Sequence, residues 1–175
     1  MTTELLHRAT DYARGVLSEL TDDDLRRPTP CEGWDAGRVV LHLADVIDGL
    51  IGLLENGELA LPQPPRINDP DPVAIVDERL VELERALHVG AGAKRVDHAL
   101  LAGAIELTTH GWDIGVACDR AHRIPDSLAE EVLAQVSAVL HVDARGANFA
   151  APVDTARDAP ASDRLIAFLG RVPRH

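Results

Sequence analysis

The segment ELTTHGWDIG, residues 106–115, sets a carboxylate and an imidazole four residues apart, at Glu106 and His110. On an α-helix such a pair lies on one face, with Cβ atoms about 6 Å apart. The pair has two interpretations, an ordinary polar pair on a helix surface or two ligands of a metal ion. Zinc and its neighbours accept imidazole nitrogen and carboxylate oxygen, and a catalytic site often has three protein ligands. A metal site would therefore need a third ligand from another helix.

Helical periodicity dominates the sequence on both sides of this segment. Asp35 is expected to cap a helix that ends at Asn56 and Gly57, and a proline-rich connection follows at 59–72. The tail is expected to hold a short extended piece. No series of strands is long enough for a sheet, so the predicted fold is all-α, a helical bundle in a single domain over residues 1–175. Helices are expected over residues 2–20, 35–56, 73–87, 97–118, 127–142 and 163–169.

The charge and the cysteine content exclude several classes of partner. A net charge of −12 argues against nucleic acid and against anionic membranes, both of which require basic surfaces. Cys31 and Cys118 have no CxxC spacing, so a reducing compartment is expected. The first residues contain charges throughout and show no secretory signal, and no apolar run reaches membrane-spanning length. A cytoplasmic protein is therefore expected, either a monomer or a homodimer.

The second helix offers His42 as the third ligand. Val39, Leu43 and Val46 belong to its predicted buried stripe, so His42 is expected to face inward with them. Bundles build metal sites from such inward side chains on facing helices. A hydrogen-bonded core histidine is the alternative for His42.

Two motifs resemble those of the mycothiol-dependent maleylpyruvate isomerase N-terminal family, part of the DinB-like metal-binding superfamily. Residues 29–46, TPCEGWDAGRVVLHLADV, are similar to its opening signature, in which a metal-binding His follows the Trp by eight residues, as His42 follows Trp34. Residues 106–117, ELTTHGWDIGVA, are similar to its second signature, Glu-x-x-x-His-x-Trp-Asp, which supplies the remaining ligands. The tail, residues 152–173, resembles the end of small single-domain actinobacterial members.

The resemblance implies a DinB-like four-helix bundle with a short C-terminal extension and a divalent metal at His42, Glu106 and His110. Zinc is the expected metal, with nickel as the alternative. The expected partners are a small-molecule thiol, mycothiol, and a small electrophilic substrate, in a thiol transfer or an isomerisation. The characterised isomerase type has a further C-terminal domain in its active site that this sequence does not show, which weighs against isomerisation itself. A non-catalytic metal- or ligand-binding module and a metal-dependent hydrolase are the alternatives.

Other residues near these motifs have competing interpretations. For Trp34 and Trp112, packing at the end of the bundle is favoured over stacking on a substrate. Asp113 is either a carboxylate that orients a ligand imidazole or a plain surface carboxylate. For Cys31 packing is favoured over a nucleophilic role, and for His7 a surface position is favoured over an extra ligand or proton shuttle. No role is assigned to the remaining histidines, and a solvated surface role is favoured over binding of an anionic substrate for Arg145, Arg157 and Arg171.

Overall fold

The computed structural model describes residues 2–90, 96–120, 123–140, 145 and 149–173. The described chain is helical and contains no strand, and its one isolated bridge pairs Pro28 with Asp35. The backbone divides into two compact units, residues 1–122 and 123–175, which are described separately below. No described helix combines the length and the apolarity needed to cross a membrane. The single domain expected over residues 1–175 stays a prediction.

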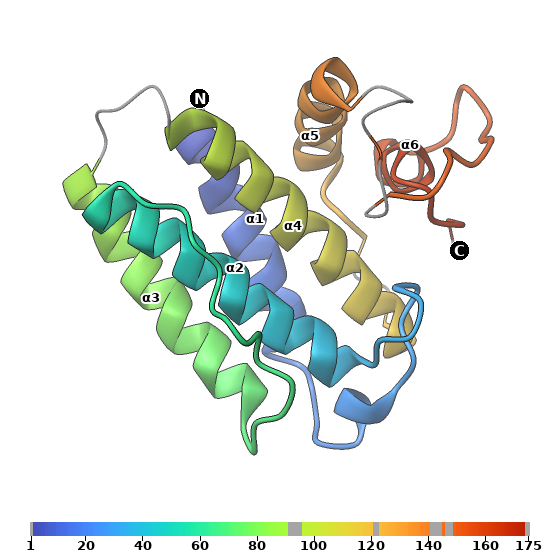
Figure 1. Ribbon diagram of the computed structural model, residues 1–175. Coiled ribbons are helices and arrows are strands. Elements are labelled where there is room, and N and C mark those ends of the chain that lie inside the picture. Colours follow the sequence, from blue (N-terminus) through green and yellow to red (C-terminus); the bar gives the residue numbers. More distant parts are fainter. Residues whose placement is uncertain (1, 91–95, 121–122, 141–144, 146–148, 174–175) are drawn as a thin grey trace. The chain divides into compact units, whose positions relative to one another are not determined.

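The first unit is a bundle of four long helices (Figure 1). Helix α4 packs against α1 and α2, and α2 packs in turn against α3, so that α2 and α4 form a central pair. The all-α, DinB-like helical bundle predicted above is confirmed. The elements of this unit are α1 (Thr2–Leu17), the 3-10 helix η1 (Asp24–Arg26), α2 (Ala36–Asn56), α3 (Pro72–Gly90) and α4 (Val96–Ala117).

The predicted helix ends differ from the observed ones by a few residues. The first helix was expected to reach residue 20 but ends at Leu17, because the amides of Glu19 and Leu20 bond three residues back instead of four and tighten the chain into a turn. Helix α3 begins one residue earlier than expected, at Pro72, where a proline costs no helical hydrogen bond. Helix α4 is displaced from its predicted range by a single residue at each end.

The second unit contains α5 (Asp126–Val139) and α6 (Ala161–Phe168), which pack against each other. The fifth helix was expected to continue to residue 142 but ends at Val139; residues 141–142 lie outside the described chain. The extended piece of the tail is joined to α6 by a hydrogen bond from the Val153 amide to the Ala167 carbonyl, 2.9 Å. Arg145 is buried, with its guanidinium 4.8 Å from the centre of the Phe168 ring, and not on a solvated surface as favoured above.

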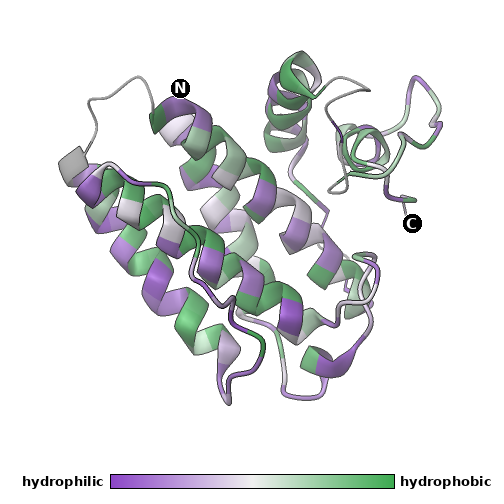
Figure 2. Ribbon diagram, viewed as in Figure 1, coloured by the Kyte–Doolittle hydropathy of each residue, from purple (hydrophilic) through white to green (hydrophobic). Residues whose placement is uncertain are grey.

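Helix α2 is amphipathic and has a defined cap at each end. Hydrophilic and hydrophobic residues alternate around α2 and α3 (Figure 2), so each helix has an apolar face for the core and a polar face outward. The predicted N-cap is confirmed, since Asp35 Oδ1 accepts the Arg38 amide at 2.8 Å, and Gly57 ends the helix with a φ of 75°. The largest fully buried side chains of this unit are aliphatic: Leu5, Leu6, Leu43, Ile47, Leu80, Leu83, Leu107 and Ile114.

Ion pairs hold the loop before α2 at one end of the bundle. Arg27 donates to Asp119 at 3.0 Å, and Arg120 donates to the buried carboxylate of Asp24 at 2.8 Å. The contacts join η1 and Arg27, the residue directly after it, to the segment that follows α4. The loop that carries Trp34 is therefore fixed beside α4, the helix that carries Glu106 and His110.

Candidate metal centre

Three side chains from the central helix pair meet at this end of the bundle. His42 comes from α2, and Glu106 and His110 come from successive turns of α4. Glu106 Oε2 lies 3.2 Å from His42 Nε2 and 3.1 Å from His110 Nε2. All three are the ligands predicted from the sequence, and the structure brings them together.

The donor set fits a divalent ion. Around a tetrahedral ion with bonds of about 2.1 Å, neighbouring donor atoms lie about 3.4 Å apart. One donor atom from each residue lies within 4.8 Å of the other two, so small side-chain rotations suffice to place an ion between them. Two nitrogens and one oxygen are ligands that zinc accepts, and three protein ligands leave a position open. The side chains of His42 and Glu106 are 24% and 32% exposed, so a small molecule can reach that position.

Trp34 packs against both imidazoles of the group. Its ring lies edge-on to His42, 5.2 Å between centres, and stacks with His110 at 6.5 Å and 18°. The two imidazoles also meet edge-on, 5.1 Å between centres. Contact with both rings supports the packing role favoured for Trp34. Trp112 is buried in the core, which agrees with the same interpretation.

Asp113 holds the ring of His110 from behind. Asp113 Oδ2 lies 2.9 Å from His110 Nδ1, and the Asp113 side chain is fully buried. A surface position for this carboxylate is therefore wrong. A carboxylate on the far nitrogen of an imidazole fixes the ring and leaves Nε2 directed at the ion site.

The charges of the group support one another. Burial raises the pKa of Glu106, but hydrogen bonds from His110 and His42 outweigh it and hold the pKa of this carboxyl well below its usual range. Burial lowers the pKa of His110, but the hydrogen bonds to Asp113 and Glu106 outweigh it and raise the pKa to about 9. At neutral pH the metal-free group thus pairs a carboxylate with an imidazolium. An incoming cation must displace the proton of His110.

Two further residues, Tyr12 and Arg38, lie beside this group and were not predicted from the sequence. Burial, together with the charge of Asp113, raises the pKa of Tyr12, so its phenol stays neutral. Its ring lies against Gly111, where a Cβ would come within 3.0 Å of Tyr12 Cε1. The guanidinium of Arg38 lies over the Trp34 ring. Arg38 had a signal, since it precedes His42 by one helical turn; Tyr12 had none, because its helix neighbours do not indicate which helix it packs against.

The remaining candidates take no part in the group of donor atoms. His7 and Cys31 are half-buried, and the metal-binding group found among the described residues includes neither. Cys118 is buried, and burial raises the pKa of its thiol. Arg157 is exposed and Arg171 half-buried, which agrees with the surface role favoured for them. His122, His141 and His175 lie outside the described residues.

Comparison with known proteins gives one family and two relatives. The sequence model of the mycothiol maleylpyruvate isomerase N-terminal domain matches residues 6–115, a range that contains His42, Glu106 and His110. Two uncharacterised proteins of Mycobacterium tuberculosis, from strains CDC 1551 / Oshkosh and H37Rv, are each 26% identical over 180 residues. The aligned region covers 95% of this chain and 96% of each relative. No solved structure matches.

Proposed function

Because the chain belongs to the mycothiol maleylpyruvate isomerase N-terminal domain family, we propose that it binds a divalent metal, zinc or nickel, through His42, Glu106 and His110. We further propose that it uses mycothiol in a thiol transfer or isomerisation of a small electrophile. The observation that carries the proposal is the convergence of two imidazole nitrogens and one carboxylate oxygen within 4.8 Å, inside the matched range. A bound divalent ion lowers the pKa of a coordinated thiol and so supplies a nucleophilic thiolate at neutral pH.

The surrounding side chains have separate tasks in this proposal. Asp113 accepts from His110 Nδ1 and keeps Nε2 free of a proton once a cation is bound. Trp34 packs against the rings of His42 and His110 and holds them in place. The exposed edges of His42 and Glu106 leave one side of the group accessible, and the thiol and its substrate enter from there.

Metal analysis and calorimetry test the proposal. The purified protein is expected to contain about one equivalent of metal, and calorimetric titration with mycothiol is expected to give binding in the metal-loaded form and none in the metal-stripped form. The same titration of His110→Ala is expected to show no thiol binding. His98→Ala, an exposed histidine of the same helix, is the matched control and retains it.

The possible results separate the competing functions. Metal at one equivalent without affinity for mycothiol would overturn the thiol chemistry and favour a hydrolase with a bound water or a binding module. Protein that takes up no zinc or nickel at all would overturn the metal assignment itself. Mycothiol binding of equal strength with and without metal would contradict the role of the ion in holding the thiol.

A further inference from the structure

Arg38 is a cation beside the metal centre with no acidic partner among the described residues. Its guanidinium carbon lies 5.1 Å from the centre of the Trp34 ring, and it donates a hydrogen bond to the main-chain carbonyl of Arg66. Neither partner carries a formal negative charge. Both partners hold the guanidinium in place, so less side-chain freedom is lost when it binds something else.

Other arginines of the first unit differ from Arg38 in this respect. Six of them have a carboxylate within ion-pair distance, and all of these except Arg26 have at least two, whereas the exposed Arg85 has none among the described residues. Arg66, the nearest example, is bound by both Asp45 and Asp48 and is thereby neutralised. Comparable pairs are Arg14 with Glu84, Arg27 with Asp119, Arg79 with Glu82 and Arg120 with Asp24. In a chain with a net charge of −12, an arginine beside the candidate ion site without such a partner has a charge available for a ligand.

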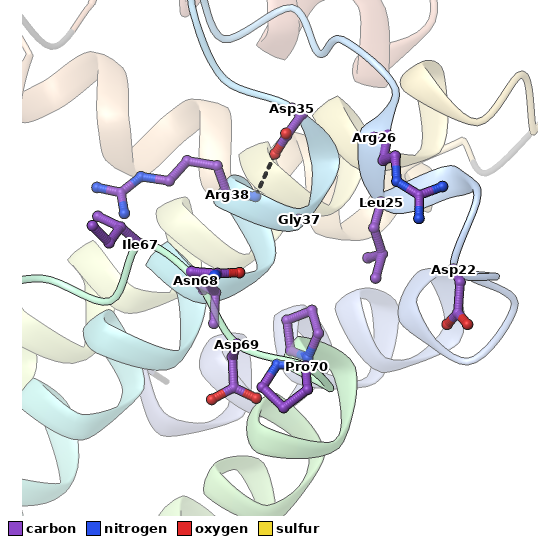
Figure 3. Close-up of a pocket in the computed structure, with 12 residues that line it drawn as sticks. Asp22, Leu25, Arg26, Asp35, Gly37, Arg38, Ile67, Asn68, Asp69 and Pro70 are labelled. Carbon is purple, nitrogen blue, oxygen red and sulfur yellow. Dashed lines mark hydrogen bonds between the residues drawn. The ribbon is translucent and has the colours of Figure 1, made fainter.

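Arg38 also lines a hollow of about 350 Å³ between the start of α2 and the segment around Pro70 (Figure 3). Three carboxylates share this lining. Asp35 caps the amide of Arg38, Asp69 accepts the amide of Asp71 at 3.0 Å, and Asp22 lies at the other side of the hollow. The guanidinium of Arg38 extends away from Asp22 and Asp69, past Ile67. It is therefore free to meet an anion on the side of Trp34.

We propose that Arg38 binds the carboxylate of a small ligand whose other end occupies the metal centre. A guanidinium has five N–H donors in a planar fork that matches a carboxylate, and the Arg66 carbonyl uses only part of them. Arg38 and His42 are one helical turn apart on α2, about 6 Å between Cβ atoms, so one small molecule can reach both. This assignment rests on the proposed function, since it takes the metal centre as the anchor for the other end of the ligand.

Matched thiols test the assignment on the cobalt-loaded protein, whose visible absorption changes when a thiolate binds the ion. The probes are 3-mercaptopropionate and 6-mercaptohexanoate, each paired with its own uncharged amide. The preference is the ratio of the affinity for the carboxylate to the affinity for its amide. For at least one pair, this ratio is expected to be about threefold greater in the wild type than in Arg38→Met, which is the size of effect found for a partly exposed ion pair. Arg38→Lys is expected to keep part of that preference.

A control variant separates a local contact from a general loss of charge. Arg26 lines the same hollow and is paired with Asp23, so Arg26→Met removes one positive charge at a comparable place. It is expected to leave the preference unchanged. Equal preferences in the wild type and Arg38→Met, or an equal loss in Arg26→Met, would overturn the assignment.

The experiment also distinguishes this inference from the proposed function. If neither thiol of either pair changes the cobalt spectrum, the thiol chemistry fails. Succinic acid monohydroxamate and its uncharged amide, which would bind the ion through the hydroxamate in place of a thiolate, then test Arg38 separately. A preference for the carboxylate that falls about threefold in Arg38→Met supports the anion site, and equal preferences in both proteins overturn it.

Discussion

The pair of helices α2 and α4 makes two different contacts less than three helical turns apart. At one end, Leu50 of α2 lies against Gly103 of α4, where an added Cβ would be 2.5 Å from Leu50 Cδ1. At the other end, the same two helices bring His42, Glu106 and His110 together. The first contact is apolar and close, whereas the second is polar and partly open to solvent. One end of the pair therefore holds the two helices together, and the other presents donor atoms to an ion.

His42→Ala tests the polar end and has the largest expected effect. Loss of one of three ligands is expected to weaken zinc binding by more than about a hundredfold, beyond the range found for residues that only support a ligand. The helical circular dichroism is expected to stay unchanged, because the apolar contact at Leu50 remains. Competition with a zinc chelator gives the affinity. His98→Ala is the control. A His42→Ala protein that binds zinc with wild-type affinity would show that His42 is not a ligand of the ion.

Gly103→Leu tests the apolar end. A leucine has no space there because Leu50 already occupies it, and overpacking is expected to lower the free energy of unfolding by about 2–3 kcal/mol. Urea denaturation of the metal-free proteins gives the value. The same substitution at Gly15, where no atom lies within 4 Å, removes a flexible glycine from α1 and is expected to stabilise by up to about 1 kcal/mol. Equal effects at both glycines would show that α2 and α4 do not pack closely at Leu50.

The two ends also differ in how far the sequence alone predicts them. Helical spacing predicts the pair of Glu106 and His110, and the apolar neighbours of His42 predict that it faces inward. Helical spacing does not predict that Leu50 meets Gly103. Periodicity shows which face of a helix is buried, but it does not show which other helix covers that face. The family signature, rather than the spacing, joined His42 to the pair on α4.

The surroundings of the centre were the least predictable part. The contact of Arg38 depends on the conformation of the proline-rich segment, which places the Arg66 carbonyl beside α2. That segment has no periodicity from which its path follows. The role of Asp113 was left open for a related reason, since position i+3 from His110 fits a buried or an exposed carboxylate equally well. Its burial follows from the packing of α4 against its neighbours.

Asp113→Asn tests a residue of the polar end that supports the ligand His110 but is not itself a ligand. An amide fixes the ring of His110 less firmly, so zinc affinity is expected to fall by about tenfold, less than in His42→Ala. The chelator competition used for His42→Ala measures both on one scale. Asp97→Asn, at an exposed position of the same helix, serves as the control. A loss as large as that of His42→Ala would mean that Asp113 does more than orient the ring.

The pH dependence of zinc binding tests the polar end alone. It has the smallest expected effect, counted for each unit of pH. In the metal-free protein Asp113 and Glu106 raise the pKa of His110 to about 9, so below that pH its proton must leave before an ion binds. One displaced proton makes the apparent affinity rise about tenfold for each pH unit between 6.5 and 8.5, with the slope flattening above 9. The pKa of Glu106 is lowered, so this carboxyl contributes no proton in that range. The same raised pKa implies that the stabilisation from protonated His110 is complete below the pKa of this histidine in the unfolded chain. It is lost as pH rises through about 9 in the metal-free protein.

Zinc titrations in buffers from about pH 6.5 to above 9 measure the slope of apparent affinity against pH. Asp113→Asn removes one cause of the raised pKa, so its slope is expected to flatten at a lower pH, whereas Gly103→Leu is expected to keep the wild-type slope. A slope near zero in the wild type would show that His110 binds the ion without releasing a proton.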